Sequence, residues 1–178
     1  KMSIYGRTFV EGEKVTGWLP INDKWYYIAE DGSMVTGIYK VGNRKYLFME
    51  DGSMKTGWFK VDDTWYYISS DGELRAQWVK SLSNWYYVDV DGKMVTGYQT
   101  INGAKYYFAS SGLMQKGWFK INGEDYYAAS SGTIQAQWVK SGRNWYYVDT
   151  DGKMVTGDYI IDRKVNYFDN QGLWMNKI

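Results

Sequence analysis

The chain has 178 residues, of which 44% are hydrophobic and 19% aromatic, a content too apolar for a disordered protein. Its 21 basic and 20 acidic residues give a net charge of +1, so no basic surface for nucleic acid is expected, and no apolar stretch is long enough to predict membrane insertion. Cys and His are absent, which excludes disulfides, thiol nucleophiles, imidazole bases and most soft metal ligands.

The first segment in chain order, residues 1–16, fits the pattern of the later chain only in part. Tyr5 and Gly12 stand in the frame of the repeat that follows, while the positions around them depart from it. The ends of repeat arrays are commonly irregular, because a terminal repeat has a neighbour on one side only. We therefore predict a partial N-terminal capping repeat in residues 1–16.

Residues 17–178 repeat with a period of twenty. One glycine series with this spacing comprises Gly12, Gly32, Gly52, Gly72, Gly92, Gly112, Gly132, Gly152 and Gly172. A second series comprises Gly17, Gly37, Gly57, Gly97, Gly117 and Gly157, with Gln77 and Gln137 interrupting it. The two series define eight copies that begin at Gly17, and the last copy is degenerate.

Each copy has the pattern of a β-hairpin. Copy one, GWLPINDKWYYIAEDGSMVT, holds two short runs rich in aromatic and β-branched residues around a polar pair, followed by an Asp-Gly turn. Other copies carry Asn-Gly at the polar pair, the dipeptide best suited to a type I′ turn. Alternation places Leu19 and Ile21 on one face of the first strand and Trp18 on the other. A lone hairpin is marginally stable, so we predict an all-β solenoid of about eight 20-residue hairpins that stack on their neighbours.

A longer duplication overlies the twenty-residue period. Residues 84–97 read NWYYVDVDGKMVTG and residues 144–157 read NWYYVDTDGKMVTG. The segments 77–97 and 137–157 match at 18 of 21 positions, and copies three to five resemble copies six to eight. A block of sixty residues has therefore been duplicated.

Two tryptophan positions vary between copies more than the positions expected to hold the fold. Both are Trp in copies one, three, four and seven, namely Trp18 with Trp25, Trp58 with Trp65, Trp78 with Trp85, and Trp138 with Trp145. Copies two, five and eight lack both, and copy six keeps Trp118 with Asp125 at the second position. The two indoles of a pair could pack on each other across the hairpin, or they could bind a ligand, and the two roles can coexist.

Paired indoles with a Tyr from the next hairpin suit a cation that cannot donate hydrogen bonds, because the ring faces supply negative potential. Quaternary ammonium is such a cation. Each ring contributes roughly 0.5 to 2 kcal/mol, and after the cost of association a three-ring site retains about 4 kcal/mol, a Kd near 1 mM. Several weak sites on one chain gain avidity of ~10² or more on a polymer that displays the ligand repeatedly.

The motif GWxxxxxxWYYxxxxGxMxTG, seen in copy one as GWLPINDKWYYIAEDGSMVTG, resembles the choline-binding (cell-wall-binding) repeats of pneumococcal surface proteins, autolysins and phage lysins. The resemblance covers essentially the whole chain. It implies a left-handed superhelix of hairpins with choline held in cavities between them. It also implies a secreted protein attached noncovalently to a Gram-positive cell wall through choline or phosphocholine of teichoic or lipoteichoic acid.

The resemblance also implies site residues: the indole after the repeat glycine, the first aromatic of the WYY triplet, a connector Met and an aromatic of the next hairpin. The sets are Trp18, Trp25, Met34 and Tyr46 in copy one; Trp58, Trp65 and Tyr86 in copy three; Trp78, Trp85, Met94 and Tyr106 in copy four; and Trp138, Trp145 and Met154 in copy seven. Leu74 replaces the Met of copy three, and Asn166 replaces the Tyr of copy seven, where Tyr167 could serve instead or the site could fail. The sequence leaves open which tyrosine of each triplet faces the ligand and whether the Met series lines the sites or only packs the connectors.

Copies two and five place Lys45 and Lys105 at the second tryptophan position. One hypothesis is that these ammonium groups lie near neighbouring rings and make the two cavities incompetent for choline. The alternative is that both are ordinary solvated lysines.

Besides choline binding, the sequence raises carbohydrate binding, enzyme activity and binding of a protein partner as possible functions. Related repeats occur in glucan-binding regions of glucosyltransferases and in clostridial toxin tails, and sugar rings also stack on aromatics, so a carbohydrate-binding module is the main alternative. No enzyme activity, metal site or cofactor is expected, because the regularly spaced Asp residues precede Gly in turns, where Asp is favoured for local hydrogen bonding. A protein partner could bind through the degenerate copies, although nothing in them identifies it.

Overall fold

The two-residue turns explain why each copy forms a hairpin. In the computed structural model, which describes residues 2–4, 7–10 and 13–176 and side chains from Val15 to Asn176, Asn102 and Gly103 have φ values of 51° and 81°. Asn22 and Asp23 have φ values of 49° and 65°. Positive φ at both central residues is the geometry of the type I′ turn, whose twist matches that of the flanking strands. The predicted turn type is confirmed at these positions.

The strands are short and occur throughout the described residues. The strands up to residue 68 are β1 (Met2–Ile4), β2 (Arg7–Val10), β3 (Glu13–Lys14), β4 (Gly17–Ile21), β5 (Lys24–Ile28), β6 (Gly37–Val41), β7 (Arg44–Phe48), β8 (Gly57–Val61) and β9 (Thr64–Ile68). The later strands are β10 (Gln77–Ser81), β11 (Asn84–Val88), β12 (Gly97–Ile101), β13 (Ala104–Phe108), β14 (Gly117–Ile121), β15 (Glu124–Ala128), β16 (Gln137–Ser141), β17 (Asn144–Val148), β18 (Gly157–Ile161) and β19 (Lys164–Phe168).

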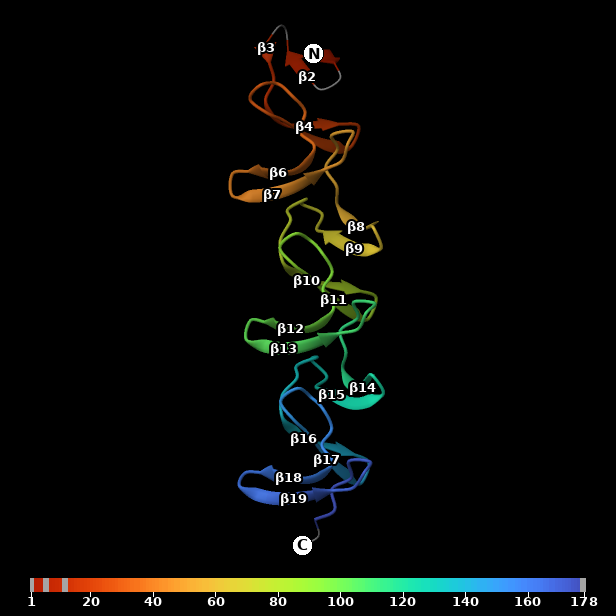
Figure 1. Ribbon diagram of the computed structural model, residues 1–178. Coiled ribbons are helices and arrows are strands. Elements are labelled where there is room, and N and C mark those ends of the chain that lie inside the picture. The colour runs from red at the N-terminus through yellow and green to blue at the C-terminus, as the bar shows by residue number, and fades with distance from the viewer. Residues whose placement is uncertain (1, 5–6, 11–12, 177–178) are drawn as a thin grey trace. The chain divides into compact units, whose positions relative to one another are not determined.

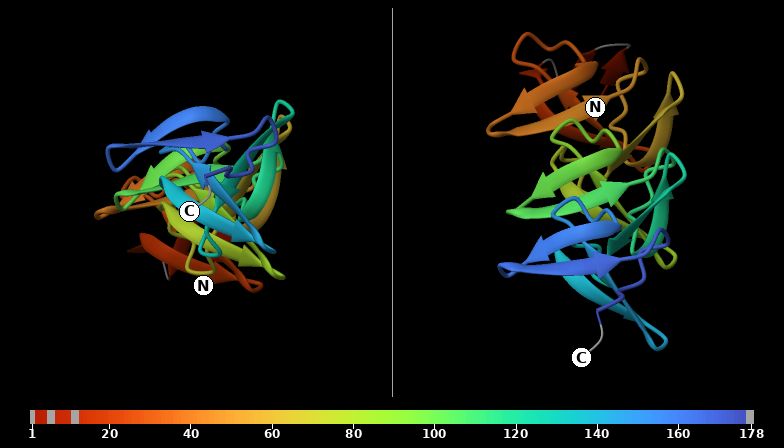
Figure 2. Two further views of the ribbon diagram at one scale, coloured as in Figure 1. Left: turned by 90° about the horizontal axis from the view of Figure 1, so that it is seen from below. Right: turned by 60° about the horizontal axis from the view of Figure 1, so that its bottom comes forward.

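Sixteen of these strands form eight two-stranded hairpins, from β4–β5 to β18–β19 (Figure 1). In the two further views of Figure 2, the strands of a hairpin again run side by side. The predicted all-β fold of eight hairpins is confirmed. Among the described residues there is no helix that could cross a membrane.

Strands β1, β2 and β3 form a separate three-stranded antiparallel sheet before the first hairpin. The two residues on which the predicted capping repeat depends, Tyr5 and Gly12, lie outside the described residues. The capping role of residues 1–16 therefore stays a prediction.

The chain forms two compact units. The first unit comprises residues 1–79 and 87–94, and the second comprises residues 80–86 and 95–178.

The most completely buried side chains of each unit occupy one position in the second strand of the hairpins. In the first unit Ile28, Phe48 and Ile68 are almost completely buried, and in the second unit Phe108 and Val148 are equally buried. Each of these residues lies two places after the middle aromatic of its strand. Burial of each such side chain contributes roughly 1.5–3 kcal/mol.

From the hairpin β6–β7 on, a backbone hydrogen bond joins the connector after each hairpin to the second strand of the hairpin before that one. The N–H of Met54, which follows the hairpin β6–β7, donates to the carbonyl of Trp25 in β5 at 2.7 Å. The same bond, with the same spacing of 29 residues, joins Leu74 to Lys45 in the first unit and Ile134 to Lys105 in the second. These are the nearest-neighbour contacts expected of a solenoid.

The turn glycine after the next hairpin leaves space for the side chain of the preceding connector. Gly72 has φ +82°, and a Cβ on it would meet Cε of Met54 at 2.6 Å as well as the sulfur. A side chain at this position would be strained by the backbone conformation and would collide with Met54. Gly72 thus fixes the place of the Met54 side chain.

Candidate functional site

Trp18 and Trp25 lie on the outer face of the hairpin β4–β5. Trp18 is opposite Tyr27 in the strand register and Trp25 is opposite Pro20, so the two indoles are diagonal neighbours. Their ring centroids are 6.2 Å apart and the ring planes are at 86°. Leu19, between Trp18 and Pro20, points the other way and is 4% exposed. The predicted assignment of residues to the two faces is confirmed for this strand.

Tyr46 of the next hairpin completes a cluster of three rings. Its centroid lies 4.8 Å from that of Trp18, with the planes at 80°. Tyr46 is 9% exposed, whereas Trp18 and Trp25 are 37% and 45% exposed. The two indoles are therefore open to solvent and not sealed in the core.

These rings line a pocket of about 370 Å³ together with Met54, Ser70 and Asp71. We call the set Trp18, Trp25, Tyr46 and Met54 cage 1. All four residues belong to the first unit. Tyr46 is the middle aromatic of its strand, so in cage 1 this position, and not the following one, faces the pocket.

The connector methionine of cage 1 is Met54, and the expected Met34 does not line the pocket. The Met34 side chain lies instead against the Cα of Gly52, close to Tyr26. The reason is the path of the chain: the connector directly after β5 leads away to the next hairpin. Only the connector after that hairpin returns and bonds to the carbonyl of Trp25.

The pair in copy three has the same geometry. Trp58 and Trp65 have centroids 6.2 Å apart with planes at 85°, and Trp65 is 41% exposed. The N–H of Met94 donates to the carbonyl of Trp65 at 2.9 Å, so Met94 stands here as Met54 does in cage 1. Tyr86 belongs to the second unit, and its grouping with these indoles stays a prediction.

In copy four, Trp85 is 37% exposed and lines a smaller pocket of about 140 Å³ with Met114. The N–H of Met114 donates to the carbonyl of Trp85 at 2.9 Å. The sequence reasoning missed Met114 because it assigned Met94 to this copy. The predicted set spans the two units, since Trp78 and Met94 are in the first and Trp85 and Tyr106 in the second, so this grouping stays a prediction.

Copy seven gains a third indole that the sequence reasoning missed. Trp138 and Trp145 have centroids 6.3 Å apart with planes at 85°, and Trp174 lies 5.4 Å from Trp138 at 75°. The N–H of Trp174 donates to the carbonyl of Trp145 at 2.8 Å, which is the bond that Met54 makes in cage 1. We call Trp138, Trp145 and Trp174 cage 7.

Positions 166 and 167, where copy seven could place a tyrosine, supply no ring contact to the tryptophan pair of this copy among the ring contacts of the described residues. Asn166 is 8% exposed, and its Oδ1 accepts a hydrogen bond from Nε1 of Trp174 at 3.0 Å. Tyr167 is 51% exposed. Met154, expected in this copy, donates its N–H to the carbonyl of Asp125 and so belongs with copy six.

Copy six combines one indole with a carboxylate. Trp118 and Tyr146 have centroids 5.6 Å apart with planes at 77°, an edge-to-face contact of the same kind as that of Trp18 and Tyr46 in cage 1. At the second tryptophan position, Asp125 pairs with Nζ of Lys120 at 2.7 Å. Copy six thus has counterparts of Trp18 and Tyr46 but a carboxylate in place of Trp25.

Comparison with known proteins identifies the repeats. The family model described as choline-binding repeat matches residues 15–47, 35–78, 95–137 and 134–177, and a model of the cell wall binding repeat matches residues 77–94. The chain belongs to the choline-binding repeat family. No curated protein sequence matches the chain.

The choline-binding repeats of this chain resemble solved structures from Streptococcus pneumoniae. Choline binding protein F, crystallised with a peptidoglycan analogue, is 28% identical with a TM-score of 0.76, over 92% of this chain and 58% of that chain. The choline-binding domain of CbpL is 26% identical with a TM-score of 0.67, over 91% of this chain and 87% of that one. The chain thus spans less than two thirds of choline binding protein F. The autolysin LytC, at 22% identity and a TM-score of 0.63, shares the fold.

Two choline-binding repeats carry a lysine, and so an ammonium group of their own, at the second tryptophan position. Lys105 Nζ lies 5.8 Å from the ring centroid of Tyr98 and 2.8 Å from Oδ1 of Asp151. Lys45 Nζ lies 2.9 Å from Oδ1 of Asp91. Both side chains are about one third exposed, and each is paired with a carboxylate. The ring contact expected of Lys105 is present; that these lysines prevent choline binding stays a prediction.

Lysines in the first strand of the hairpin also lie over the tryptophan at the second position in several choline-binding repeats. Lys60, Lys80 and Lys140 place Nζ 5.8, 5.8 and 5.7 Å from the centroids of Trp65, Trp85 and Trp145, respectively. In copy one this strand position is Pro20. Cation–π contacts of this kind compete with a ligand cation for the negative potential of the ring.

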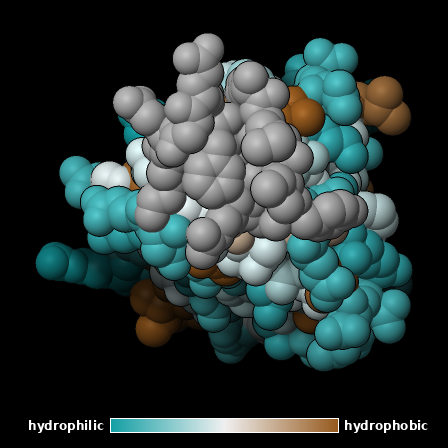
Figure 3. Space-filling model, turned by 90° about the horizontal axis from the view of Figure 1, so that it is seen from above, coloured by the Kyte–Doolittle hydropathy of each residue, from teal (hydrophilic) through white to brown (hydrophobic). Residues whose placement is uncertain are grey.

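The face seen in the space-filling view is mainly hydrophilic where its side chains are described (Figure 3). Seen from above, its described side chains are mostly polar, and the hydrophobic ones lie singly (Figure 3). Single exposed apolar side chains are normal on a protein surface.

Proposed function

We propose that the chain attaches a secreted protein noncovalently to the bacterial cell wall by binding choline or phosphocholine of teichoic or lipoteichoic acid. The ligand groups are held in the aromatic cages between successive hairpins. The observation that carries the proposal is cage 1, where three rings from two hairpins surround a solvent-open pocket of about 370 Å³.

The chemistry of cage 1 suits a trimethylammonium group. Trp18 is nearly perpendicular to both Trp25 and Tyr46, so the three rings form walls in different directions. The faces of the rings attract a cation, and Met54 adds a polarisable apolar surface for the methyl groups. A quaternary nitrogen needs no hydrogen-bond acceptor, and the faces of the rings attract it without one.

Cage 7 offers a second ligand site of similar design. Its three indoles come from β16, β17 and the connector after β19, and Trp145 is 38% exposed. Indole has the strongest cation–π attraction of the aromatic side chains, so the replacement of Met by Trp174 compensates for the absence of a Tyr at position 166. The amide of Asn166 holds the edge of the Trp174 ring and leaves its faces to the rings and the ligand.

Attachment requires several cages at once. A single three-ring site has a Kd near 1 mM, which is too weak to hold a protein on a surface. Simultaneous binding of two or more ligand groups on one polymer raises the apparent affinity by ~10² or more, because each later contact is intramolecular. The four copies with both tryptophans supply the sites for this mechanism.

The relatives support this proposal. Choline binding protein F, 28% identical to this chain, has been crystallised in complex with ipratropium and in the presence of a peptidoglycan analogue. Ipratropium is a quaternary ammonium compound. The match to cell wall binding repeats supports a location at the cell surface.

Choline titration monitored by tryptophan fluorescence tests the proposal. We expect choline to change the emission and to raise the unfolding temperature, because a ligand that binds only the folded state stabilises it. A neutral isostere, 3,3-dimethylbutanol, is the control for charge, and a glucan oligomer is the control for carbohydrate binding. If the glucan changes both signals and choline changes neither, the chain is a carbohydrate-binding module and the proposal fails.

A further inference from the structure

Cage 1 differs from a purely aromatic site because a carboxylate lies on its wall. Asp71 lines the same pocket as Trp18, Trp25, Tyr46 and Met54. It comes from the connector after β9 and follows Trp25 by 46 residues. Its side chain is about half exposed, so a ligand in the pocket can reach it.

Two other copies show what a carboxylate at this place does. Asp91 follows Lys45 by 46 residues and lies 2.9 Å from its Nζ, and Asp151 follows Lys105 by 46 residues and lies 2.8 Å from its Nζ. The spacing therefore brings the turn carboxylate to an ammonium group at the second tryptophan position. In copy one this position is Trp25, and Asp71 lines a pocket where the other two copies have their own lysine.

Copies three and four, which also have paired tryptophans, lack this acid. The residues that follow Trp65 and Trp85 by 46 positions are Ser111 and Ser131. The same position thus carries a carboxylate opposite both lysines and in cage 1, and an uncharged hydroxyl in copies three and four.

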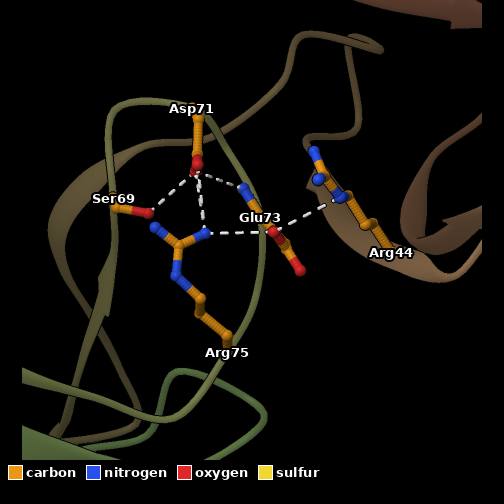
Figure 4. A network of polar contacts seen from close by, with 5 residues as sticks. All are labelled: Arg44, Ser69, Asp71, Glu73 and Arg75. Atoms are coloured by element: carbon orange, nitrogen blue, oxygen red, sulfur yellow. Dashed lines mark hydrogen bonds and ion pairs between the residues drawn. The ribbon is translucent and has the colours of Figure 1, made fainter.

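A network of polar contacts holds Asp71 in place (Figure 4). Its Oδ1 accepts hydrogen bonds from Oγ of Ser69 at 2.8 Å and from the backbone N–H of Glu73 at 3.0 Å. Its Oδ2 accepts from Nη1 of Arg75 at 3.0 Å. Arg75 also bonds to Glu73 at 3.1 Å, and Glu73 pairs with Arg44 at 3.7 Å.

The network decides how Asp71 can act on a ligand. Asp71 and Glu73 are balanced by Arg75 and Arg44, so the group has no net charge to attract every cation alike. Oδ1 of Asp71 accepts from Ser69, Glu73 and Arg75, whereas among the described residues Oδ2 accepts from Arg75 alone, so Oδ2 keeps a lone pair for a ligand donor. Such an acceptor favours a ligand that has a proton to donate, because a charge-assisted hydrogen bond is directional.

We propose that cage 1, through Asp71, prefers ammonium ions that retain an N–H, namely protonated primary to tertiary amines, over quaternary ammonium. The inference rests on the proposed function, since it takes cage 1 to be an ammonium site. Asp71 is then a specificity-determining residue, and the cages of one chain differ in the ammonium groups that they select.

The experiment compares choline with dimethylethanolamine, its protonated tertiary analogue, on the full chain. Indole N–H signals in ¹H–¹⁵N spectra, assigned with single Trp→Phe variants, report Trp18 and Trp25 of cage 1 separately from Trp138 and Trp145 of cage 7. The test variant is Asp71→Ser, which copies the residues native to copies three and four. The control is Asp31→Ser, at the same turn position, because Asp31 lines a different pocket.

We expect Asp71→Ser to weaken dimethylethanolamine binding at cage 1 by about fivefold, the loss of one partly exposed charge-assisted hydrogen bond, and to change choline binding by less than about twofold. The cage 7 signals and the Asp31→Ser variant should keep the wild-type affinities for both amines. An equal effect of Asp71→Ser on the two amines, or no effect on either, overturns the inference while the proposed function stands. If neither amine shifts the cage 1 signals of the wild-type chain, the proposed function itself fails at this cage.

Discussion

Replacing Trp25 by Val should remove one wall of cage 1 and leave the hairpin folded. Copy eight already carries Val165 at this position, in a hairpin with the same register as the others, so the backbone accommodates the residue. Trp25 is 45% exposed and its main ring partner is Trp18 at 6.2 Å. The stability cost should therefore be limited to that aromatic pair, about 1 kcal/mol.

The loss of binding follows from the same contacts. One ring of a cation–π cage contributes roughly 0.5 to 2 kcal/mol, which corresponds to a weakening of about 2- to 30-fold. We expect the upper half of that range, because Trp25 is one of only three ring walls in the pocket and Pro20 places no competing cation on it.

The assay is a choline titration followed through the indole N–H signal of Trp18. The signals of Trp138 and Trp145 in the same spectra are the internal control, and they should titrate as in the wild-type chain. Circular dichroism at the titration temperature checks that the variant is folded. If Trp25→Val changes the choline affinity at Trp18 by less than twofold, the indole is not a wall of the site and the reasoning for cage 1 is refuted.

Three further predictions concern the stability of the chain and the place of Met54 in cage 1. Gly72→Ala should destabilise the chain by about 1–2 kcal/mol in urea unfolding and weaken choline binding at cage 1, because the new Cβ displaces Met54; Gly103→Ala, with a similar φ but open space around it, should affect stability alone. Leu82→Asn should raise the free energy of unfolding by about 1 kcal/mol, since Leu82 has φ 57° and is 93% exposed, and an unchanged urea midpoint would contradict this. Burial, together with nearby ionised groups, raises the pKa of Tyr98, so its contribution to stability is complete below the unfolded-state pKa of about 10 and is lost as pH rises through the folded-state value. The Tyr98→Phe variant should lose less stability than the wild type between pH 9 and about pH 11, and equal losses would count against this.

The hairpins and their buried positions could be predicted from the sequence because the signals for them are local. The Asn-Gly turn at residues 102 and 103 and the alternation around Leu19 each specify their geometry within a few residues. The burial of Ile28 and Phe48 follows from the same alternation combined with the need of each hairpin to cover one face.

The composition of each cage could be predicted only in part because it depends on how the chain returns after a full repeat. A period of twenty places a Met in most connectors, so the pattern is the same whether a cage uses the connector 9 or 29 residues after its second tryptophan. The backbone bond from Met54 to Trp25 decides in favour of the later one. Trp174 escaped notice for the same reason, although it stands in register with Met154.

Contacts between copies that are not neighbours in sequence were also beyond local reasoning. The pairs Lys45–Asp91 and Lys105–Asp151 join residues 46 positions apart, and the sequence shows each partner only as a surface charge or a turn residue. The approach of Asp71 to cage 1 belongs to the same class of contact. Such pairs become visible once the path of the repeats fixes which connector faces which hairpin.

The central claim, that several weak aromatic cages together attach the chain to a choline-bearing polymer, is tested most directly by binding to surfaces of graded choline density. Surface plasmon resonance of the full chain on a polymer with sparse or dense choline, beside a glucose-bearing polymer of equal density, gives the apparent Kd. We predict that the dense surface binds at least ~10² more tightly than the sparse one and that free choline releases the chain at about its single-site Kd near 1 mM. An apparent Kd that is independent of choline density, or equal binding to the glucose-bearing polymer, would contradict the account.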